Sequence, residues 1–388
     1  MRKVLICFSV LLLLTGCWDQ RLVKDINLIY SQALDQTDDG LIETTIVTIG
    51  GAQMQSGSQS ETSTEPAVIS ATGYTPRDSR MNLDRKVSGQ LFTSKNRVTL
   101  LSEAIAQENI YSVLDVHYRS PLSTTNAHIA VVEGEAKKVL NVKNVESPLV
   151  SDYIGDLLYS LKDNMLIPDP SLEVVMSDIF DEGLDTALPL LTVVDDESVA
   201  LKGLALFDQD QMTGKIDADQ TLRLLLMDKK KSKTSTIYTC RKKIQLRNYV
   251  TVDVEEKKRD LKIIKEFNGE YSANIDLTLM LNVVEYPKDT LYIEEHTERL
   301  NEAIKNKLQV ECEEVIRLIQ EANCDYFGIG KHIMAYHYED WKQMDWEEKY
   351  QQMTINTSVE TEIIYHGIVT KVANNLVCHD INYSPHPK

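Results

Sequence analysis

Apolar positions in the first third of the chain recur with the period of two that is typical of β-strands. Two such runs, at 28–34 and 41–49, lie on either side of the turn sequence Thr-Asp-Asp-Gly at 37–40. Because glycine adopts a positive φ without a steric penalty, an Asp-Gly pair between two strand-like runs predicts a β-hairpin. Similar runs predict further strands at 68–74, 97–101 and 126–132.

Segments with helical spacing separate these strands. In 151–164 the apolar residues recur at intervals of three and four, which places them on one face of a helix. The segments expected to be helical are 78–92, 102–107, 109–117, 135–140, 151–164 and 172–180. Strands that alternate with helices predict a mixed α/β layer rather than a β-sandwich.

From about residue 188 the pattern changes mainly to strands. The expected elements are strands at 190–194 and 198–207, a turn at 208–214, a helix at 219–229, and strands at 234–254, 273–285 and 355–364. The longest helical pattern, Glu294–Asn323, carries one apolar stripe and would be about 45 Å long at 1.5 Å per residue. We expect the stripe to pack on the sheet of its own domain, with a coiled-coil partner helix as the alternative.

Together these patterns predict an α+β or mixed α/β fold with about three domains. The length of 388 residues and the hydrophobic fraction of 43% fit two or three domains with sizeable cores. The expected divisions are a signal peptide at 1–16, a mixed α/β domain at 17–188, a strand-rich middle domain at 189–265 and a C-terminal domain at 266–388. The segment 50–65, rich in Gly, Ser, Gln and Thr, cannot bury apolar surface and is expected to be a flexible loop.

The first 17 residues have the layout of a secretory signal. Basic residues at 2–3 precede an apolar run of 11 residues at 4–14, and the small residues at 15–16 lead to Cys17. This run is far shorter than the ~20 residues a spanning helix needs, and no other apolar run reaches 18. The pattern resembles a bacterial lipobox, in which Cys17 becomes the first mature residue and carries lipid. The alternatives are an ordinary signal peptide with a chance cysteine and a start that is not cleaved.

A lipid on Cys17 would anchor the chain firmly. Burial of acyl chains is worth ~0.8 kcal/mol per methylene, and a diacylglyceryl group brings two chains where one alone binds only marginally. The expected arrangement is therefore a soluble body tethered to the outer face of a membrane.

The chain is acidic except for one segment. It contains 59 Asp and Glu against 41 Lys and Arg, a net charge of −18, which becomes −20 once the two basic residues of the leader are removed. Between Lys229 and Lys265, 13 basic residues face only 4 acidic ones, so this stretch carries +9 and the rest −29. Such an acidic body disfavours nucleic acid. The basic segment suits anionic headgroups or an acidic partner, but we expect a solvated sheet edge whose lysines discourage aggregation.

The residue spacings that catalysis or metal binding requires are absent from the sequence. The segment 325–331, Asp-Tyr-Phe-Gly-Ile-Gly-Lys, lacks the first glycine of a phosphate loop and follows a helix rather than a strand. Gly328 and Gly330 are expected to end the long helix and allow a tight turn. There is no GxSxG or HExxH motif, and His332 and His337 are too far apart for one helical face. The chain is therefore not expected to be an enzyme or to hold a metal or cofactor.

Cleavage and acylation would leave four unmodified cysteines, Cys240, Cys312, Cys324 and Cys378. An even number in an exported protein permits disulfides. Their scattered positions fit small buried hydrophobes better than a disulfide framework, and a bond between Cys312 and Cys324 stays an open alternative.

Several segments in a fixed order resemble the Ger(x)C family, the lipoprotein C subunit of nutrient germinant receptors in endospore-forming bacteria. They are LTGCWD at 14–19, LLSEAIAQENIYSVLDVHYRS at 100–120, LPLLTVV at 188–194, LKGLALFDQDQMTGKI at 201–216, CDYFGIG at 324–330, Trp341, Trp346 and a final strand leading to Gly367. Each is weak alone, and their order behind a lipobox makes the resemblance specific over almost the whole chain.

The resemblance implies a three-domain ectodomain on the outer leaflet of the inner spore membrane. It implies a non-catalytic subunit that supports the nutrient response beside an integral-membrane A-type subunit and a B-type subunit. Only Cys17 acquires a role by motif position, as the lipidation site. Arg119 and the turn 327–330 match family positions that we interpret as structural. The alternative is a solute-binding lipoprotein of an uptake system, which needs two doubly wound lobes around a crevice; a cell-wall hydrolase would need paired carboxylates in a cleft.

Overall fold

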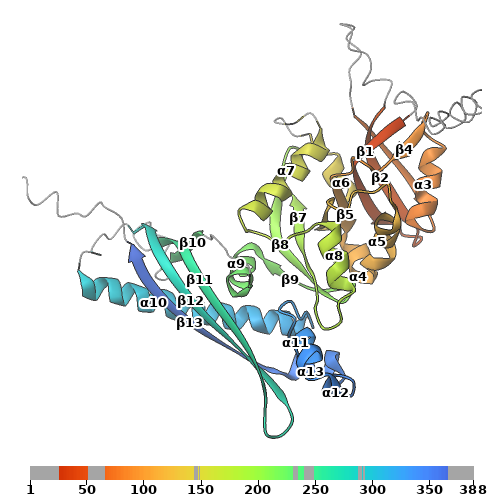
Figure 1. The fold of residues 1–388 in the computed structure, drawn as a ribbon. Helices are drawn as coiled ribbons and strands as arrows, with labels where there is room; N and C mark the ends of the chain where they lie inside the picture. The colour runs from red at the N-terminus through yellow and green to blue at the C-terminus, as the bar shows by residue number, and fades with distance from the viewer. Residues whose placement is uncertain are drawn as a thin grey trace, which may run out of the picture.

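A computed structural model describes residues 26–50, 66–143, 147, 149–229, 235–239, 249–286, 291 and 293–365. Within these residues the strands form two sheets, one in each half of the chain, and a single long helix lies along the second (Figure 1). The expected mixed α/β class is confirmed. The described strands form two sheets, and the division into about three domains stays a prediction.

The first sheet has the strand order β3-β2-β1-β5-β6-β7-β8-β9, with β4 added beside β1. Its strands are β1 (Ile26–Gln36), β2 (Ile42–Gly50), β3 (Ala67–Gly73), β4 (Gln90–Phe92), β5 (Val98–Ser102), β6 (His128–Val132), β7 (Ala187–Val193), β8 (Val199–Asp208) and β9 (Gln211–Asp217). The centre, β1-β5-β6-β7, is parallel, and antiparallel strands extend it on both sides. Parallel neighbours need long crossovers, which explains the helices between these strands.

The β1–β2 hairpin forms as the Asp-Gly signal predicted. Gly40 has a φ of 76°, and its N–H donates to the Thr37 carbonyl at 2.8 Å. A positive φ at this position is why glycine follows Asp39 in the turn. The chain then returns in antiparallel register, with Leu34 opposite Thr44.

Helices cover both faces of the central strands. They are α3 (Pro76–Asp84), α4 (Glu103–Glu108), α5 (Ile110–Arg119), α6 (Lys137–Leu140), α7 (Val150–Asp163) and α8 (Leu172–Ile179). On β5, Leu101 packs with α4, α5 and α8, whereas its neighbour Leu100 packs with α6 and α7 on the opposite face. Successive side chains of a strand point to opposite faces, so the continuous apolar runs of these strands fill two cores.

The second sheet has the order β10-β11-β12-β13, and a long hairpin of β11 and β12 extends from it (Figure 1). The strands are β10 (Ser235–Thr239), β11 (Tyr249–Lys265), β12 (Tyr271–Glu285) and β13 (Thr354–Tyr365). The helix α10 (Glu294–Glu321) packs on it through the predicted stripe, all of it buried: Leu300, Ile304, Leu308, Cys312, Val315, Ile319 and Ala322. The stripe faces the sheet of its own half, as expected.

One core joins the two sheets. The helix α9 (Ala218–Met227) follows β9 and lies between α10 and the first sheet, and its Leu224 belongs to the same buried cluster as Leu277 of β12 and Leu308 of α10. The chain then continues through α11 (Ile329–Tyr336), α12 (Tyr338–Trp341) and α13 (Trp346–Gln352) to β13. The division expected at residue 188 falls inside β7 and would cut a hydrogen-bonded sheet.

Two predicted elements differ from the structure. The helix expected over 78–92 ends at Asp84, and residues 90–92 instead form β4, because they pair with β1. The turn expected over 208–214 is only two residues long, with Gln209 at a φ of 55°, and β9 starts at Gln211. Both errors concern strands whose partners lie elsewhere in the fold. The predicted signal peptide lies outside the described residues, and so does the predicted loop 50–65 except for Gly50, which is the last residue of β2.

Candidate functional site

The predicted lipidation site, Cys17, lies outside the described residues, which begin at Ile26 at the start of β1. Ile26 follows Cys17 by nine positions in the sequence, and an extended chain spans at most 3.3–3.6 Å per residue. A lipid on Cys17 would therefore hold the first residue of β1 within about 30 Å of the membrane.

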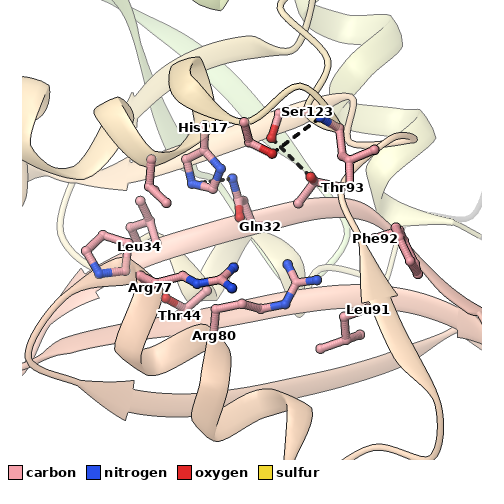
Figure 2. A pocket seen from close by; sticks show the side chains of 14 residues that line it. Gln32, Leu34, Thr44, Arg77, Arg80, Leu91, Phe92, Thr93, His117 and Ser123 are labelled. Atoms are coloured by element: carbon pink, nitrogen blue, oxygen red, sulfur yellow. Dashed lines mark hydrogen bonds between the residues drawn. The ribbon is translucent and has the colours of Figure 1, made fainter.

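The described residues contain a cavity of about 110 Å³ between β1, β2, α3 and α5 (Figure 2). Its wall is polar on two sides and apolar at one end. The lining residues are Gln32, Leu34, Thr44, Pro76, Arg77, Arg80, Leu91, Phe92, Thr93, Val116, His117, Ser120, Leu122 and Ser123. None of these residues is acidic, although the chain as a whole is strongly acidic. We call this the arginine cavity.

Two arginines of α3 supply its charge. Thr75 caps the helix by accepting from the N–H of Asp78 at 3.1 Å, and Pro76 occupies the first turn, where its missing N–H costs nothing. Arg77 and Arg80 follow three residues apart, so they share one side of the helix. Figure 2 shows both guanidinium groups directed toward the space that Gln32 and His117 border from the other side.

The opposite wall is a neutral hydrogen-bonding surface. The side chain of Gln32, 2% exposed, donates from Nε2 to Thr99 Oγ1 at 2.9 Å and lies 3.0 Å from His117 Nε2. Burial, followed by the charge of Arg80, lowers the pKa of His117 to about 4. The imidazole is thus neutral near pH 7, and its Nε2 accepts the amide proton of Gln32.

Sequence reasoning missed this cavity. Its residues come from the strands β1, β2 and β4, the helices α3 and α5 and the loops that follow β4 and α5, between positions 32 and 123. Short stretches of chain that lie far apart in the sequence therefore meet only in the folded protein. The available signal was a pair of like charges on one side of a helix, which costs energy unless something compensates.

A second polar cluster joins the two halves of the chain around Asp325. Its Oδ1 accepts from the N–H of Ile329 at 2.9 Å, and its Oδ2 accepts from the N–H of Gly330 at 2.7 Å. The side chain is fully buried, and this burial raises its pKa to about 7 against the lowering effect of the N–H groups. The carboxyl thus satisfies the first free N–H groups of α11.

Asp185 extends this cluster to the first sheet. Its Oδ1 accepts from the N–H of Gln209 in the β8–β9 turn at 2.8 Å, and its Oδ2 accepts from the N–H of Asp325 at 2.8 Å. Burial raises its pKa to about 6. Nearby, the N–H of Lys331 donates to the carbonyl of Gly183 at 2.8 Å. We call these contacts the carboxyl junction.

The glycines of the 324–330 motif have a different role from the one predicted. The long helix ends at Glu321, and Asn323, with a φ of 53°, takes the left-handed conformation just after it. Gly328, with a φ of 67°, instead precedes α11. Gly330 packs so closely that a Cβ there would lie 2.6 Å from Nε1 of Trp346. The motif is a tight connection between helices, as the glycines suggested, but it starts the next helix.

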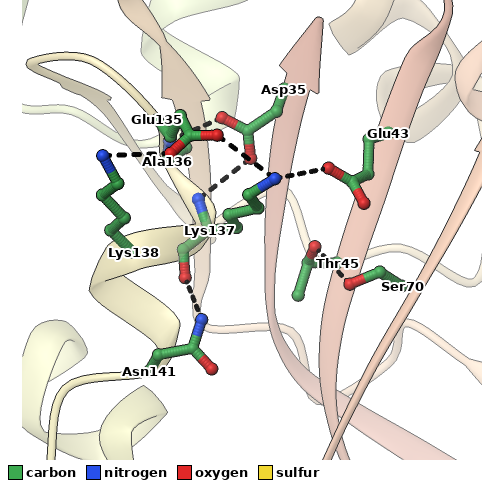
Figure 3. A network of polar contacts seen from close by, with 9 residues as sticks. All are labelled: Asp35, Glu43, Thr45, Ser70, Glu135, Ala136, Lys137, Lys138 and Asn141. Atoms are coloured by element: carbon green, nitrogen blue, oxygen red, sulfur yellow. Dashed lines mark hydrogen bonds and ion pairs between the residues drawn. The ribbon is translucent and has the colours of Figure 1, made fainter. Parts of the chain in front are cut away.

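A third polar cluster fastens the first hairpin to α6 (Figure 3). Asp35, at the end of β1, accepts from the N–H groups of Ala136 at 2.6 Å and Lys137 at 2.9 Å. The ammonium of Lys137 lies 3.0 Å from Glu43 and 3.2 Å from Glu135. Every polar group drawn in this cluster has a partner within the chain, so we interpret it as structural.

The described part of the basic segment is largely paired. Lys257 donates to the carbonyls of Leu225 and Asp228, both at 2.9 Å, and burial lowers its pKa to about 8. Lys262 and Lys265 form ion pairs with acidic residues of the same half. Along β11, the pairing with β10 covers only residues 249–253, so beyond them the strand lies at the edge of the described sheet. Residues 230–234 and 240–248 lie outside the described part.

The remaining candidates are dispersed. Cys312 and Cys324 are buried free thiols, so they are not bonded to each other. His332 stacks on Tyr336 and His337 on Tyr271. Among the described residues no three His, Cys, Asp or Glu lie close enough to hold a metal ion, and none of the helices there has the length and apolarity to cross a membrane. Arg119 is exposed and pairs with Asp115 at 2.6 Å.

Comparison with known proteins accounts for nearly the whole chain. The spore germination protein N-terminal domain matches residues 19–193, and the spore germination B3/GerAC-like C-terminal domain matches residues 202–367. Spore germination protein GerQC of Bacillus cereus is 21% identical over 95% of this chain and 99% of its own length. The spore germination protein B3 of Bacillus subtilis (strain 168) is 21% identical over 95% of this chain and 99% of its own length.

A solved structure has the same fold. The crystal structure of the GerBC protein matches with a TM-score of 0.55 at 17% identity, covering 86% of this chain and 96% of that chain. The two successive domain models and the full-length relatives agree with the motif order found in the sequence. The chain therefore belongs to the Ger(x)C family of spore germination proteins.

Proposed function

We propose that this chain is the lipid-anchored, non-catalytic C subunit of a nutrient germinant receptor. It is held on the outer face of the membrane through Cys17 and acts through contacts with integral-membrane A-type and B-type subunits. The observation that carries the proposal is the succession of both germination domains over residues 19–367, which matches the relatives over their full length. No catalytic step and no cofactor other than the lipid enter the proposal.

The start of the chain supports the anchor. The lipobox-like sequence LTGC ends at Cys17, and the first sheet begins nine residues later. A two-chain lipid binds a bilayer almost permanently, and a tether this short would hold the N-terminal half beside the headgroups. Partner subunits embedded in the same membrane would then be within reach of its surface.

The alternative of a solute-binding lipoprotein fits the fold poorly. Such a protein needs two doubly wound α/β lobes around a crevice. The second sheet here has three antiparallel strands and one parallel strand, and α10 packs against it. It is therefore not a second copy of the first half.

Exchange of the acylated thiol tests the anchor. Cys17→Ala should move the protein from the membrane to the soluble fraction, abolish its labelling by palmitate and weaken nutrient-triggered germination. Cys7→Ala is the matched control, because Cys7 lies in the apolar run of the leader and would be removed with it. It should leave all three readouts unchanged. Full membrane retention and full palmitate labelling of Cys17→Ala would overturn the proposed anchor.

The receptor role has its own test. Purification of the acylated protein from membranes should bring the two integral-membrane subunits with it. Deletion of the chain should abolish the response to one nutrient class while a trigger that does not act through a nutrient receptor still causes germination. A normal nutrient response in the deletion strain would refute the receptor role, whatever the state of Cys17.

A further inference from the structure

The arginine cavity contains a buried positive charge that the chain compensates poorly. The side chain of Arg80 is 16% exposed, and its Nε is buried without a hydrogen-bond partner. Arg80 forms a loose ion pair with the half-exposed carboxylate of Asp84, whose Oδ1 lies 3.7 Å from Nε, too far for a hydrogen bond. Desolvation is the largest effect on Arg80 and lowers its pKa. Buried charges are normally paired, because an unpaired one costs several kcal/mol.

Arg77 adds to this imbalance. It lies three residues before Arg80 on the same side of α3, and its charge further lowers the pKa of Arg80. No ion pair of Arg77 is found among the described residues, and no lining residue of the cavity is acidic. Helices usually avoid like charges at this spacing. The presence of two arginines side by side at this cavity, within a chain of net charge −18, points to a ligand of negative charge.

The chemistry of the wall defines that partner. Planar guanidinium groups recognise the oxygens of carboxylates and phosphates through paired hydrogen bonds. The hydroxyl groups of Thr93 and Ser123 form a hydrogen bond with each other at 3.1 Å and line the same space, so one of their two protons is left to donate to a ligand. Leu91 and Phe92 provide an apolar end. The lining lacks a carboxylate to pair with an ammonium group, so an anion without a fixed positive charge fits best.

The volume limits the size of the ligand. A single water needs at least about 10–15 Å³ of such space, so a cavity of about 110 Å³ has room for a few waters or for a ligand of a few non-hydrogen atoms. This is the size of a phosphate ion or of a carboxylic acid with a short carbon chain. A whole phospholipid or a nucleotide would not fit inside it.

We propose that the arginine cavity is a binding site for a small oxyanion, held by the guanidinium groups of Arg77 and Arg80 beneath Gln32. This inference does not depend on the proposed receptor role. Inorganic phosphate and short carboxylates such as butyrate share the oxyanion that the arginines would bind. They differ in charge and in their need for the apolar end at Leu91 and Phe92.

Titration of the purified full chain with each probe tests the site. Calorimetry at constant ionic strength with inorganic phosphate and, separately, with butyrate should give saturable binding of at least one at a single site. Tighter binding of butyrate would assign the site to carboxylates, and tighter binding of phosphate would assign it to phosphates. Absence of saturable binding of both probes up to 50 mM would overturn the proposal.

Three arginine variants locate the binding. Arg80→Gln and Arg77→Gln should each lower the affinity for the probe at least tenfold, because each removes one of the two guanidinium groups. Arg85→Gln is the matched control, since Arg85 follows the same helix, is exposed, bonds Asn82 and does not line the cavity. It should change affinity less than twofold. An equal loss in all three variants would indicate a general charge effect and refute the site.

A folding defect in Arg80→Gln would not hide the answer. Arg77 is an exposed residue, so the substitution Arg77→Gln should leave the packing of α3 intact. Leu122→Asn gives an independent readout, because Leu122 is an apolar lining residue that is 47% exposed and its change to Asn should weaken butyrate more than phosphate. Unchanged binding in Arg77→Gln, with a native thermal transition, would also overturn the proposal.

Discussion

The buried carboxyl of Asp325 should give the protein a pH-dependent stability that one substitution isolates. Asn has nearly the same shape but cannot ionise. It also leaves one of the two N–H groups, of Ile329 or Gly330, without an acceptor. Loss of a hydrogen bond to a buried group costs about 1–3 kcal/mol, so Asp325→Asn should be less stable than the wild type at low pH.

The magnitude follows from the raised pKa. Burial moves the pKa of Asp325 from 3.8 to about 7. The folded protein therefore keeps a proton that the unfolded chain has already released, and stability is lost as the pH rises toward 7. One pKa unit corresponds to about 1.36 kcal/mol. Between pH 5 and pH 7, ionisation at Asp325 should thus lower the free energy of unfolding by about 2 kcal/mol.

Other groups make the wild-type profile alone ambiguous. Burial also raises the pKa of Asp185 to about 6, which acts in the same direction. The pKa of His117 is lowered to about 4, so its contribution to stability increases as the pH rises from 4 to 6.5. The difference between wild type and Asp325→Asn at each pH cancels the contribution of His117. It reports Asp325 together with its coupling to Asp185, whose charge helps to raise the pKa of Asp325.

Urea unfolding at pH 5, 6, 7 and 8 measures this difference. The advantage of the wild type should shrink by about 2 kcal/mol from pH 5 to pH 7. Gln320→Ala is the control, because it removes two hydrogen bonds, to the carbonyls of Tyr350 and Met353, without removing a titratable group. Its cost should not change with pH. A constant difference for Asp325→Asn would mean that the N–H groups outweigh desolvation and keep the carboxylate ionised, which would refute the reasoning.

Two further predictions concern packing. Gly183→Ala places a Cβ 2.5 Å from the backbone nitrogen of Lys331, whereas Gly134→Ala has a similar φ, 77° against 75°, and nothing within 4 Å. Urea unfolding should show that Gly183→Ala lowers the free energy of unfolding by about 1–3 kcal/mol more than Gly134→Ala does. Equal losses in the two variants would show that the close approach at Gly183 is unimportant. Leu308→Ala, at a fully buried stripe position, should cost about 2–5 kcal/mol. Val310→Ala on the same helix, 63% exposed, should change stability by less than about 0.5 kcal/mol; similar effects would contradict the packing of α10 on the sheet.

Elements stabilised by near neighbours in the sequence were predictable. The β1–β2 hairpin needs only a turn that accepts a positive φ, and Gly40 supplies it. The stripe of α10 needs only the spacing of apolar residues, which a helix converts directly into a face. The family was recognisable for a similar reason, because ordered motifs persist in the sequence whatever their contacts.

Elements stabilised by residues far away in the sequence could not be predicted from their own sequence. The segment 90–92 continues a helical pattern, and it becomes β4 only because β1 offers hydrogen bonds. Residues 211–214 belong to the predicted turn 208–214, and they become part of β9 by pairing with β8. Short strands have little intrinsic preference, so the neighbouring strand decides their conformation.

By itself the sequence determined the order of most of the elements, the face that the long helix α10 buries and the membership of the family, and it predicts the acylation of Cys17. Only the tertiary structure decided that Arg77 and Arg80 face Gln32 and His117, and that Asp185 meets the backbone of Asp325. Local patterns fix local dihedrals and faces, whereas a cavity or a junction depends on where distant faces meet. That meeting is set by the packing of the whole core, which no short stretch of sequence contains.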